Sequence, residues 1–411
     1  SGGRADADTS LTIAMDAFSD CNHLEDITGG YRVSEVGWYA FDSCVNLKNM
    51  DIGMGLKKID NAFKGCRSLR KICLSNKIED INGEAFSNGA CKEFSVEDGS
   101  ESYKSIDGCL YKIVDSEKDN LKLMYAANTT DFKYATPENV TEADMCAFRG
   151  RDNIKEIDIG GEIEELSWYS LINCSNLETL KLSSKLKSFD RDMTAYSFDN
   201  DLTNLKNIIV DEGNTEYESY NNELFEKGKK NLILLPYGSD SIVIPKETEY
   251  ICGGIAKNKF KNIKVEDGNK YFTVNSNVLY NKDITEIIIF PSYKTTYTLP
   301  ATLKEFPSMT YRYTENYLDI EGEAWITRAD ENLECVKVAK GNEVYKAVDG
   351  VLYLKNTKQL EYYPPAKKGS YKIIEGTKYV NNAAFIYTKY LTSLTVPDSV
   401  KSIIISPKDS E

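Results

Sequence analysis

The sequence of 411 residues contains a single histidine, His23, and this scarcity excludes most familiar catalytic and zinc sites. A serine or cysteine nucleophile needs a base, which is almost always histidine. The usual zinc sites need cysteine and histidine ligands clustered at short spacing, but the ten cysteines are spread along the chain without a Cys-x-x-Cys pair. No glycine-rich phosphate-binding fingerprint is present. We therefore expect no catalytic residue, no metal and no cofactor.

The sequence also lacks a basic surplus and any long apolar run. Its formal net charge is -14, whereas nucleic acids and anionic lipids attract basic surfaces. No run of about 18 apolar residues could span a membrane, and no signal peptide is recognisable. We expect no nucleic-acid partner, no direct membrane insertion, and a monomer that its acidity keeps soluble. Residues 1–12 are interpreted as a tag remnant or flexible N-terminus.

What the sequence does contain is a repeat of about 23 residues built on Ala-Phe. The position of this phenylalanine, called here the phenylalanine place, is occupied by Phe18, Phe41, Phe63, Phe86, Phe148, Leu171 and Phe385. Aliphatic residues follow six, nine and eleven positions later in most copies. This spacing predicts a short strand with one buried face. Before the strand we expect a tight apolar turn, formed by a single turn of helix, whose phenylalanine fills the interior.

The repeated pattern, written IxxIgxxAFxxCxxLxxIxL, resembles the BspA-like leucine-rich repeats of bacterial surface proteins. It covers residues 13–210 and, less regularly, residues 378–405. The resemblance implies a leucine-rich repeat solenoid, a β/α superhelix of mostly short parallel strands with short helical turns. One unit cannot bury its apolar face, but stacked copies can. We expect about ten such rungs.

Cysteines recur three residues after the phenylalanine place, as Cys21, Cys44, Cys66 and Cys174. We expect them to be small interior side chains with free thiols. The alternative is a cross-link, because neighbouring rungs bring α-carbons within disulfide range. His23 lies five residues after the phenylalanine place, where most other copies carry asparagine or serine, and is expected in a solvated loop.

A second motif pairs two aromatic residues eight positions apart around a two-residue turn. The aromatic pairs are Tyr103/Tyr111, Tyr217/Phe225, Phe272/Tyr280 and Tyr345/Tyr353. The turn residues between them, Asp107-Gly108, Asn221-Asn222, Ser276-Asn277 and Asp349-Gly350, tolerate positive φ and predict a β-hairpin. A return strand that ends at proline in three copies follows each hairpin. Such insertions also resemble those of the same family.

Hairpin geometry divides the two aromatics of each pair between opposite faces. A two-residue turn sets Ser105 opposite Leu110, so Tyr103 and Leu110 share a face, which leucine marks as core. The second aromatics, Tyr111, Phe225, Tyr280 and Tyr353, then form a row on the other face. Either a neighbouring strand covers this row, or the row is exposed and contacts sugar or peptide.

We predict one solenoid over residues 13–405, followed by a C-terminal tail at 406–411. Regular repeats occupy residues 13–99, and an irregular rung with a short helix near Trp325 occupies 303–335. The hairpin insertions are expected at 100–139, 211–247, 266–301 and 339–377.

Polar residues alternate with the buried ones on the predicted strands and face outward. They form either an ordinary solvated sheet or a concave recognition surface of the kind solenoids often use. The candidates for such a surface are Asn49, Asp51, Lys71, Glu156, Asp158, Thr179 and Lys181.

The family resemblance implies a non-enzymatic protein of the cell surface or extracellular space, its signal peptide already removed. Its partner would be a protein or glycan of a cell surface or matrix, recognised for adhesion. One alternative is a polysaccharide-binding accessory protein that uses the aromatic row. A second is a hydrolase, since a glycosidase needs only two carboxylates about 5 to 9 Å apart.

Overall fold

The computed structural model describes residues 10–30, 32–52, 55–89, 91–130, 132–190, 202–236, 239–252, 260–291, 293–306, 310–314, 317–321 and 331–404. The chain divides into two compact units. Unit 1 comprises residues 1–193 and 197–227, and unit 2 comprises residues 194–196 and 228–411. Each is a solenoid of short, mostly parallel strands, as predicted. The single solenoid over 13–405 stays a prediction, and the tail at 406–411 lies outside the described residues.

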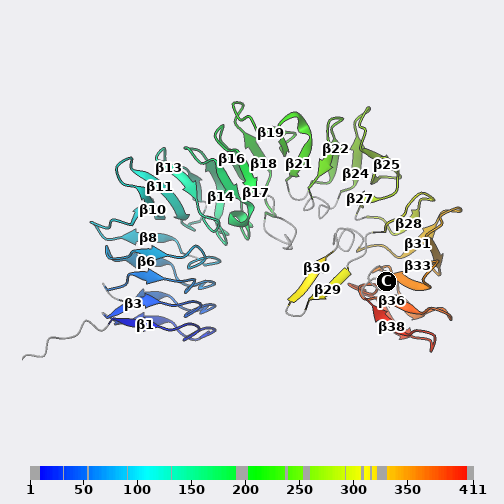
Figure 1. Ribbon diagram of the computed structural model, residues 1–411, viewed down its shortest axis with the longest axis horizontal. Helices are drawn as coiled ribbons and strands as arrows, with labels where there is room; N and C mark the ends of the chain where they lie inside the picture. Colours follow the sequence, from blue (N-terminus) through cyan, green and yellow to red (C-terminus); the bar gives the residue numbers. More distant parts are fainter. Residues whose placement is uncertain are drawn as a thin grey trace, which may run out of the picture. The chain divides into compact units, whose positions relative to one another are not determined.

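Two rows of parallel strands run through unit 1 (Figure 1). The first row begins with the sheet β1 (Leu11–Ile13), β3 (Val33–Val36), β5 (Lys58–Ile59) and β7 (Asp80–Ile81), and continues with β15 (Glu165–Ser167) and β17 (Ser188–Asp190). The second row contains β2 (Asp26–Thr28) with β4 (Asn49–Asp51), β6 (Lys71–Leu74) with β8 (Glu93–Val96), and the sheet β12 (Phe132–Ala135), β14 (Ile154–Ile159), β16 (Thr179–Leu182) and β18 (Asn207–Val210). Pairing is in register, so that equivalent apolar residues align across rungs.

Unit 1 also contains two of the predicted hairpins. The first, β9 (Tyr103–Ile106) and β10 (Cys109–Asp115), continues antiparallel into β11 (Asn120–Tyr125), which pairs in parallel with β13 (Val140–Ala143). The second is β19 (Tyr217–Tyr220) with β20 (Glu223–Glu226). Ser105 lies opposite Leu110, as predicted.

Unit 2 repeats the same arrangement with other strands. Its parallel pairs are β21 (Asn231–Leu234) with β23 (Tyr250–Ile251), β22 (Ser241–Ile244) with β24 (Asn262–Val265), β28 (Thr296–Leu299) with β31 (Cys335–Val338), and β35 (Gly369–Lys372) with β37 (Leu391–Thr395). Its hairpin sheets are β25 (Phe272–Asn275), β26 (Val278–Asn281) and β27 (Ile287–Ile289), and then β32 (Tyr345–Val348), β33 (Val351–Leu354), β34 (Gln359–Tyr362), β36 (Tyr379–Asn381) and β38 (Ser402–Ile404).

The eight hairpin turn residues confirm the predicted turn chemistry. All have positive φ, between 47° at Asp349 and 75° at Gly108. Such angles at both central residues match the right-handed twist of the flanking strands. Within the irregular segment 303–335, the structure shows an antiparallel pair, β29 (Thr310–Thr314) and β30 (Tyr317–Glu321). The helix expected near Trp325 lies outside the described residues.

Stacked phenylalanine rings fill the interior of the first rungs. The rings of Phe18, Phe41, Phe63 and Phe86 lie face to face, with centroids 5.1, 5.2 and 5.6 Å apart and interplanar angles of 6°, 4° and 8°. Phe41, Phe63 and Phe86 are buried. Phe18 is exposed, contrary to the interior position predicted for it, because the described residues place no rung over its other side. The stack is thus a continuous core running along the solenoid.

The turns that carry these rings are not helical, which corrects the prediction of short helical turns. Their backbone N–H groups donate to the neighbouring rung: Phe41 N to Ala62 O (2.9 Å) and Phe63 N to Ala85 O (2.9 Å). A group engaged across rungs cannot also close an i→i−4 helical bond. Among the described residues, helix is limited to two short 3-10 segments, η1 (Trp168–Leu171) and η2 (Lys227–Lys229).

The cysteines at the recurring interior place have a hydrogen-bonding role. Cys44 Sγ donates to Phe18 O (3.1 Å), and Cys66 Sγ to Phe41 O (3.2 Å), in each case on the preceding rung. Cys174 does the same with Phe148 O at 3.0 Å. These four cysteines are free thiols, as predicted, and so are the other six. Cys21 is exposed rather than interior, for the same reason as Phe18.

The rung with the β9–β10 hairpin has no Ala-Phe turn of its own. The Ala-Phe turns of the rungs before and after it, at Phe86 and Phe148, therefore lie next to each other. Tyr125 takes the place of the phenylalanine, its ring centroid 5.6 Å from that of Phe86. The following turn lies so close to the preceding one that a Cβ on Gly150 (φ +73°) would be 2.4 Å from Asn88 Cα. This closure brings together side chains 65 and 85 positions apart in the sequence.

Candidate functional site

Four of the predicted surface residues lie on one continuous sheet of unit 1, formed by β12, β14, β16 and β18. Register pairs Glu156 with Thr179 and Asp158 with Lys181. The same two rows of side chains extend to the strands on either side. We call the resulting surface the outward face; it comprises Lys133, Ala135, Glu156, Asp158, Thr179, Lys181, Asn207 and Ile209.

Ion pairs across the strands balance the charge of the outward face. Glu156 lies 3.0 Å from Lys133 and 2.5 Å from Lys181, and Lys181 lies 3.6 Å from Asp158. The hydrogen bond from Lys181 lowers the pKa of Glu156, and the reciprocal contact raises the pKa of Lys181. Two lysines thus face two carboxylates. Unit 1 as a whole has 25 Lys and Arg against 42 Asp and Glu, a net charge of -17.

The other three predicted surface residues lie on separate two-stranded sheets. Asn49 on β4 donates to Asp26 Oδ1 at 2.5 Å, and Lys71 on β6 pairs with Glu93 at 2.8 Å. Asp51 is exposed at the end of β4. These side chains therefore look outward, as predicted, but the structure does not join them to the outward face.

The aromatic row is buried, so of the two alternatives the covered row is confirmed and the exposed sugar-binding row is wrong. Tyr111, Tyr280 and Tyr353 are each 1% exposed, and Phe225 is 0% exposed. Tyr280 Oη and Tyr297 Oη lie 2.7 Å apart, and Tyr353 Oη and Tyr371 Oη 2.6 Å apart. Neighbouring strands cover the row, and the buried hydroxyls of two of its three tyrosines each pair with the hydroxyl of a second tyrosine. Because the row is buried, it cannot serve as the sugar-binding surface of a polysaccharide-binding accessory protein.

The copy without a tyrosine shows why the pairing matters. Phe225 replaces the tyrosine, and Ile242 stands at the place that Tyr297 and Tyr371 occupy in the other copies. In these three copies the two hydroxyls are therefore either both present or both absent. Burial raises the pKa of Tyr280 to about 12, which keeps this hydroxyl protonated at neutral pH.

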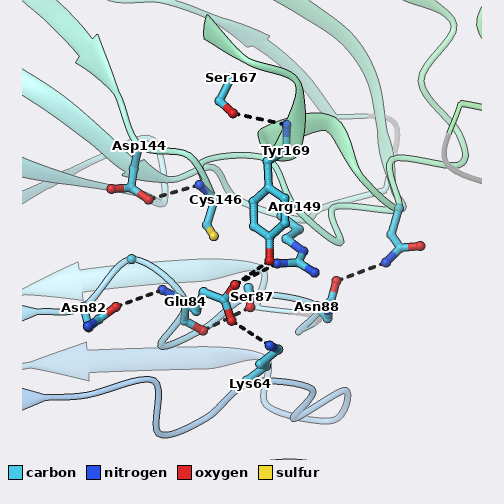
Figure 2. A network of polar contacts seen from close by, with 12 residues as sticks. Lys64, Asn82, Glu84, Ser87, Asn88, Asp144, Cys146, Arg149, Ser167 and Tyr169 are labelled. Carbon is cyan, nitrogen blue, oxygen red and sulfur yellow. Dashed lines mark hydrogen bonds and ion pairs between the residues drawn. The ribbon is translucent and has the colours of Figure 1, made fainter. Parts of the chain in front are cut away.

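A polar network forms where the turns close over the hairpin rung (Figure 2). Glu84 accepts hydrogen bonds from Arg149 Nη1 (2.9 Å) and Tyr169 Oη (2.5 Å) at one oxygen, and from Lys64 Nζ (2.6 Å) at the other. The guanidinium of Arg149 stacks on the ring of Tyr169, 3.8 Å from its centroid. Its carboxylate, base and hydroxyl make this network the natural place to look for catalysis.

The chemistry of the network fits a structural role. Both carboxylate oxygens of Glu84 already accept hydrogen bonds from side chains of the protein itself. The nearby thiol of Cys146 is buried, and burial raises its pKa to about 12, so it is not a thiolate nucleophile at neutral pH. His23 is exposed and belongs to the first rung of unit 1. The network instead ties together rungs that the hairpin insertion separates in sequence.

Three other carboxylates bear on the hydrolase alternative. Burial alone raises the pKa of Glu223 to about 8, with no second carboxylate contributing. Glu286 and Glu305 are paired in an isolated parallel bridge outside the named strands. Burial and then the charge of Glu305 raise the pKa of Glu286. Glu305 is exposed on the sheet surface. Like-charge proximity is present there, but the hydrolase alternative stays a prediction.

Sequence reasoning missed a buried asparagine that precedes three hairpins. Asn342 is 1% exposed; its Nδ2 donates to Pro300 O and Leu303 O (both 2.9 Å), and its Oδ1 accepts from Val344 N and Tyr345 N. Asn214 and Asn269 repeat this pattern. The signal that could have found them is Gly-Asn three residues before the first hairpin aromatic.

A buried arginine was also missed. Arg151 is 0% exposed and lies three residues after the phenylalanine place, where four other copies have cysteine. Its guanidinium donates to Ala126 O (2.7 Å), Gly89 O (3.0 Å) and Phe86 O (3.4 Å). Desolvation lowers its pKa. A donor side chain longer than cysteine is needed to reach these carbonyls, because the hairpin rung has no Ala-Phe turn between them and Arg151.

Neither a metal site nor a membrane-crossing helix occurs in the part of the chain that the structure describes. No three His, Cys, Asp or Glu side chains gather there as potential metal ligands. None of its helices has the length and apolar character to cross a membrane.

Comparison with known proteins identifies a repeat family. The model for the BspA type leucine rich repeat region matches residues 7–112 and 125–231, in 6 copies, which is just over half of the chain. No curated protein matches the chain.

Several solved structures are similar at low identity. A leucine-rich repeat protein from Eubacterium ventriosum is 14% identical, with 90% of this chain and 74% of that chain covered and a TM-score of 0.38. A leucine rich cell surface protein from Faecalibacterium prausnitzii is 16% identical, with 63% and 79% covered and a TM-score of 0.33. The pneumococcal vaccine antigen PcpA is 18% identical, with 74% and 66% covered and a TM-score of 0.26.

Proposed function

Because the chain belongs to the BspA-type leucine-rich repeat family, we propose that it is a non-enzymatic binding protein of the cell surface or extracellular space. The family fits a role in surface recognition, and leucine-rich repeat proteins are generally non-enzymatic. Its partner would be a protein or a glycan of a host or bacterial surface, or of the matrix, bound by a monomer for adhesion or recognition. A fold alone does not name that partner.

The observation that carries this proposal is the outward face of unit 1. Four strands in register present two parallel rows of side chains, so that a partner would meet many side chains at fixed spacing. Solenoids recognise partners through contiguous surfaces of this kind. The lysines and carboxylates already neutralise one another. A partner therefore need not bring a strong opposite charge.

Ile209 gives the outward face an exposed apolar side chain that a partner could cover. Its side chain is 46% exposed at an outward position of β18, next to Lys181 in register. An exposed aliphatic group within a polar rim has the composition of an interface anchor. We expect Ile209 to be covered when the partner binds, with the ion pairs of Lys181 at the edge of the contact.

The experiment is binding to arrays of matrix proteins and glycans, followed by affinity measurement on each hit. Ile209→Asp places a charge at the anchor and should weaken binding at least about tenfold, the effect of losing about 1.4 kcal/mol. Val114→Asp is the matched control, because Val114 is 48% exposed on β10, outside the outward face. No binding on either array, or equal affinities for the parent and Ile209→Asp, would contradict the proposal.

A further inference from the structure

The last rung of unit 2 breaks a rule that the other rungs obey two residues after the phenylalanine place. That position has positive φ in every described copy, and the other copies fill it with residues that tolerate such angles: Asp20, Ser43, Gly65, Asn88, Gly150 and Asn173. The last rung has Tyr387 there, with φ +58°. A bulky residue in the left-handed region is strained and is a genuine outlier.

The surrounding structure does not compensate for the strain at Tyr387. Its side chain is 48% exposed, and no described group offers its hydroxyl a hydrogen bond. Tyr39, the other tyrosine with positive φ among the described residues, is half-buried and packs edge-on against Trp38 with centroids 5.9 Å apart. A strained residue without a structural benefit indicates a functional constraint.

The last rung also differs from the other copies three residues further on, at Tyr390. Five residues after the phenylalanine place, three of the other six copies have asparagine. In two of them its side chain bonds to the preceding rung: Asn46 donates to Asn22 O (2.6 Å), and Asn176 to Asp152 O (2.6 Å). Asn46 and Asn176 are exposed although further rungs follow them, so a side chain at this position can face solvent inside the stack. The last rung has Tyr390 there, 49% exposed. Tyrosine cannot reproduce the amide bond, and its ring is left on the surface.

Two balanced ion pairs border the tyrosines. The ammonium of Lys368 lies 5.7 Å from the centroid of the Tyr390 ring and 4.0 Å from Glu334. Lys389, between the two tyrosines in sequence, lies 3.4 Å from Glu331. The rim thus supplies two ammonium groups and two carboxylates, with no net charge.

We propose that Tyr387 and Tyr390 form a binding site for a neutral glycan built of pyranose sugars. One face of a pyranose ring carries mainly C–H groups and packs on an aromatic ring, while its hydroxyls both donate and accept hydrogen bonds. Exposed tyrosines match the first property, being apolar rings with a polar tip. Carboxylates paired with ammonium groups match the second. A charge-balanced rim favours a neutral sugar over an acidic one.

This site is independent of the function proposed for the outward face. Its residues lie in unit 2, whereas the outward face lies in unit 1. A glycan bound at this site would also appear on the glycan array. Its affinity should fall in Tyr387→Asn and Tyr390→Asn and stay unchanged in Ile209→Asp, whereas a partner of the outward face should show the reverse, so the variants distinguish the two proposals.

The chain's own repeats provide the test. Tyr387→Asn and Tyr390→Asn each install a residue that other rungs carry at the same place, so both variants should fold. Tyr387→Asn should melt at an equal or higher temperature than the parent because its strain is relieved. Titration calorimetry with maltohexaose, cellohexaose and mannohexaose should show binding of at least one of them by the parent. Either variant should weaken that binding at least tenfold.

Controls distinguish this site from other exposed tyrosines and other ligands. Tyr293→Asn removes an exposed tyrosine outside the site and should bind like the parent. Tyr390→Trp keeps an aromatic surface and should retain binding. The proposal is overturned if none of the three hexasaccharides binds, if both asparagine variants bind like the parent, or if an oligogalacturonate or a proline-rich peptide binds the site in their place.

Discussion

The paired hydroxyls of the buried tyrosine row lead to a prediction about non-additivity. Tyr280 and Tyr297 are 1% and 4% exposed, and their hydroxyl oxygens are 2.7 Å apart. Tyr280→Phe leaves the hydroxyl of Tyr297 buried without its partner, and Tyr297→Phe does the converse. Leaving a buried polar group unsatisfied costs about 1 to 3 kcal/mol, whereas removing both partners of a hydrogen bond can be nearly neutral.

Each single substitution should therefore lower the free energy of unfolding by about 1 to 2 kcal/mol, and the double substitution by less than their sum. The coupling should be at least about 1 kcal/mol. The copy with Phe225 and Ile242 shows that a rung folds without either hydroxyl.

Urea denaturation measures the free energies, and hydrogen exchange of the β26 and β28 amides locates the change. Exchange is needed because long repeat arrays can lose two-state cooperativity. Tyr390→Phe, at an exposed ring, is the control and should change stability by less than about 0.5 kcal/mol. Strictly additive effects, or single substitutions no worse than the control, would refute the reasoning.

Three further substitutions test individual contacts. Arg151→Met leaves three buried carbonyls without their donor and should cost about 3 to 5 kcal/mol in urea denaturation; a stable variant would show that they find other partners. Asn342→Ala removes four buried hydrogen bonds and should speed hydrogen exchange in β32 and destabilise by about 2 to 4 kcal/mol; unchanged exchange would contradict this. Glu223 has a folded pKa raised from 4.5 to about 8, so its contribution to stability is full below pH 4.5 and is lost as pH rises through 8. Glu223→Gln should therefore raise the melting temperature at pH 9 and leave it nearly unchanged at pH 4, with a ceiling of about 5 kcal/mol; equal shifts at both pH values would count against the assignment.

Much of the architecture was predictable because each repeated position meets the same local environment. Aliphatic residues at a fixed period require stacking, and Asp-Gly or Asn-Asn between aromatics requires a turn with positive φ. The interior place of Cys44 and Cys66 follows from the same periodicity. The helical turn was predicted wrongly because short-range pattern does not reveal that the Phe41 and Phe63 amides bond to the next rung.

The candidate surface was less predictable. Alternation identifies outward positions such as Lys181, but only strand register shows that it joins Glu156 in one face. The alternation of side chains along each strand places Tyr111 and Tyr280 on a second face. It does not show whether another strand covers that face. The sequence shows Arg151 at the repeat position where four other copies have cysteine. It does not show the three carbonyl partners of Arg151, because they come from other rungs and are in reach only where the turns on either side of the hairpin rung meet.

The comparison of Phe63→Ala with Phe18→Ala tests most directly the claim that stacked rungs share one continuous core. Both rings belong to the same stack, but Phe63 is 1% exposed and Phe18 is 44% exposed. Unfolding of both variants in urea should show a loss of about 3 to 5 kcal/mol for Phe63→Ala, through the cavity it opens, and a clearly smaller loss for Phe18→Ala. Equal losses, or a Phe63→Ala variant as stable as the parent, would contradict the account.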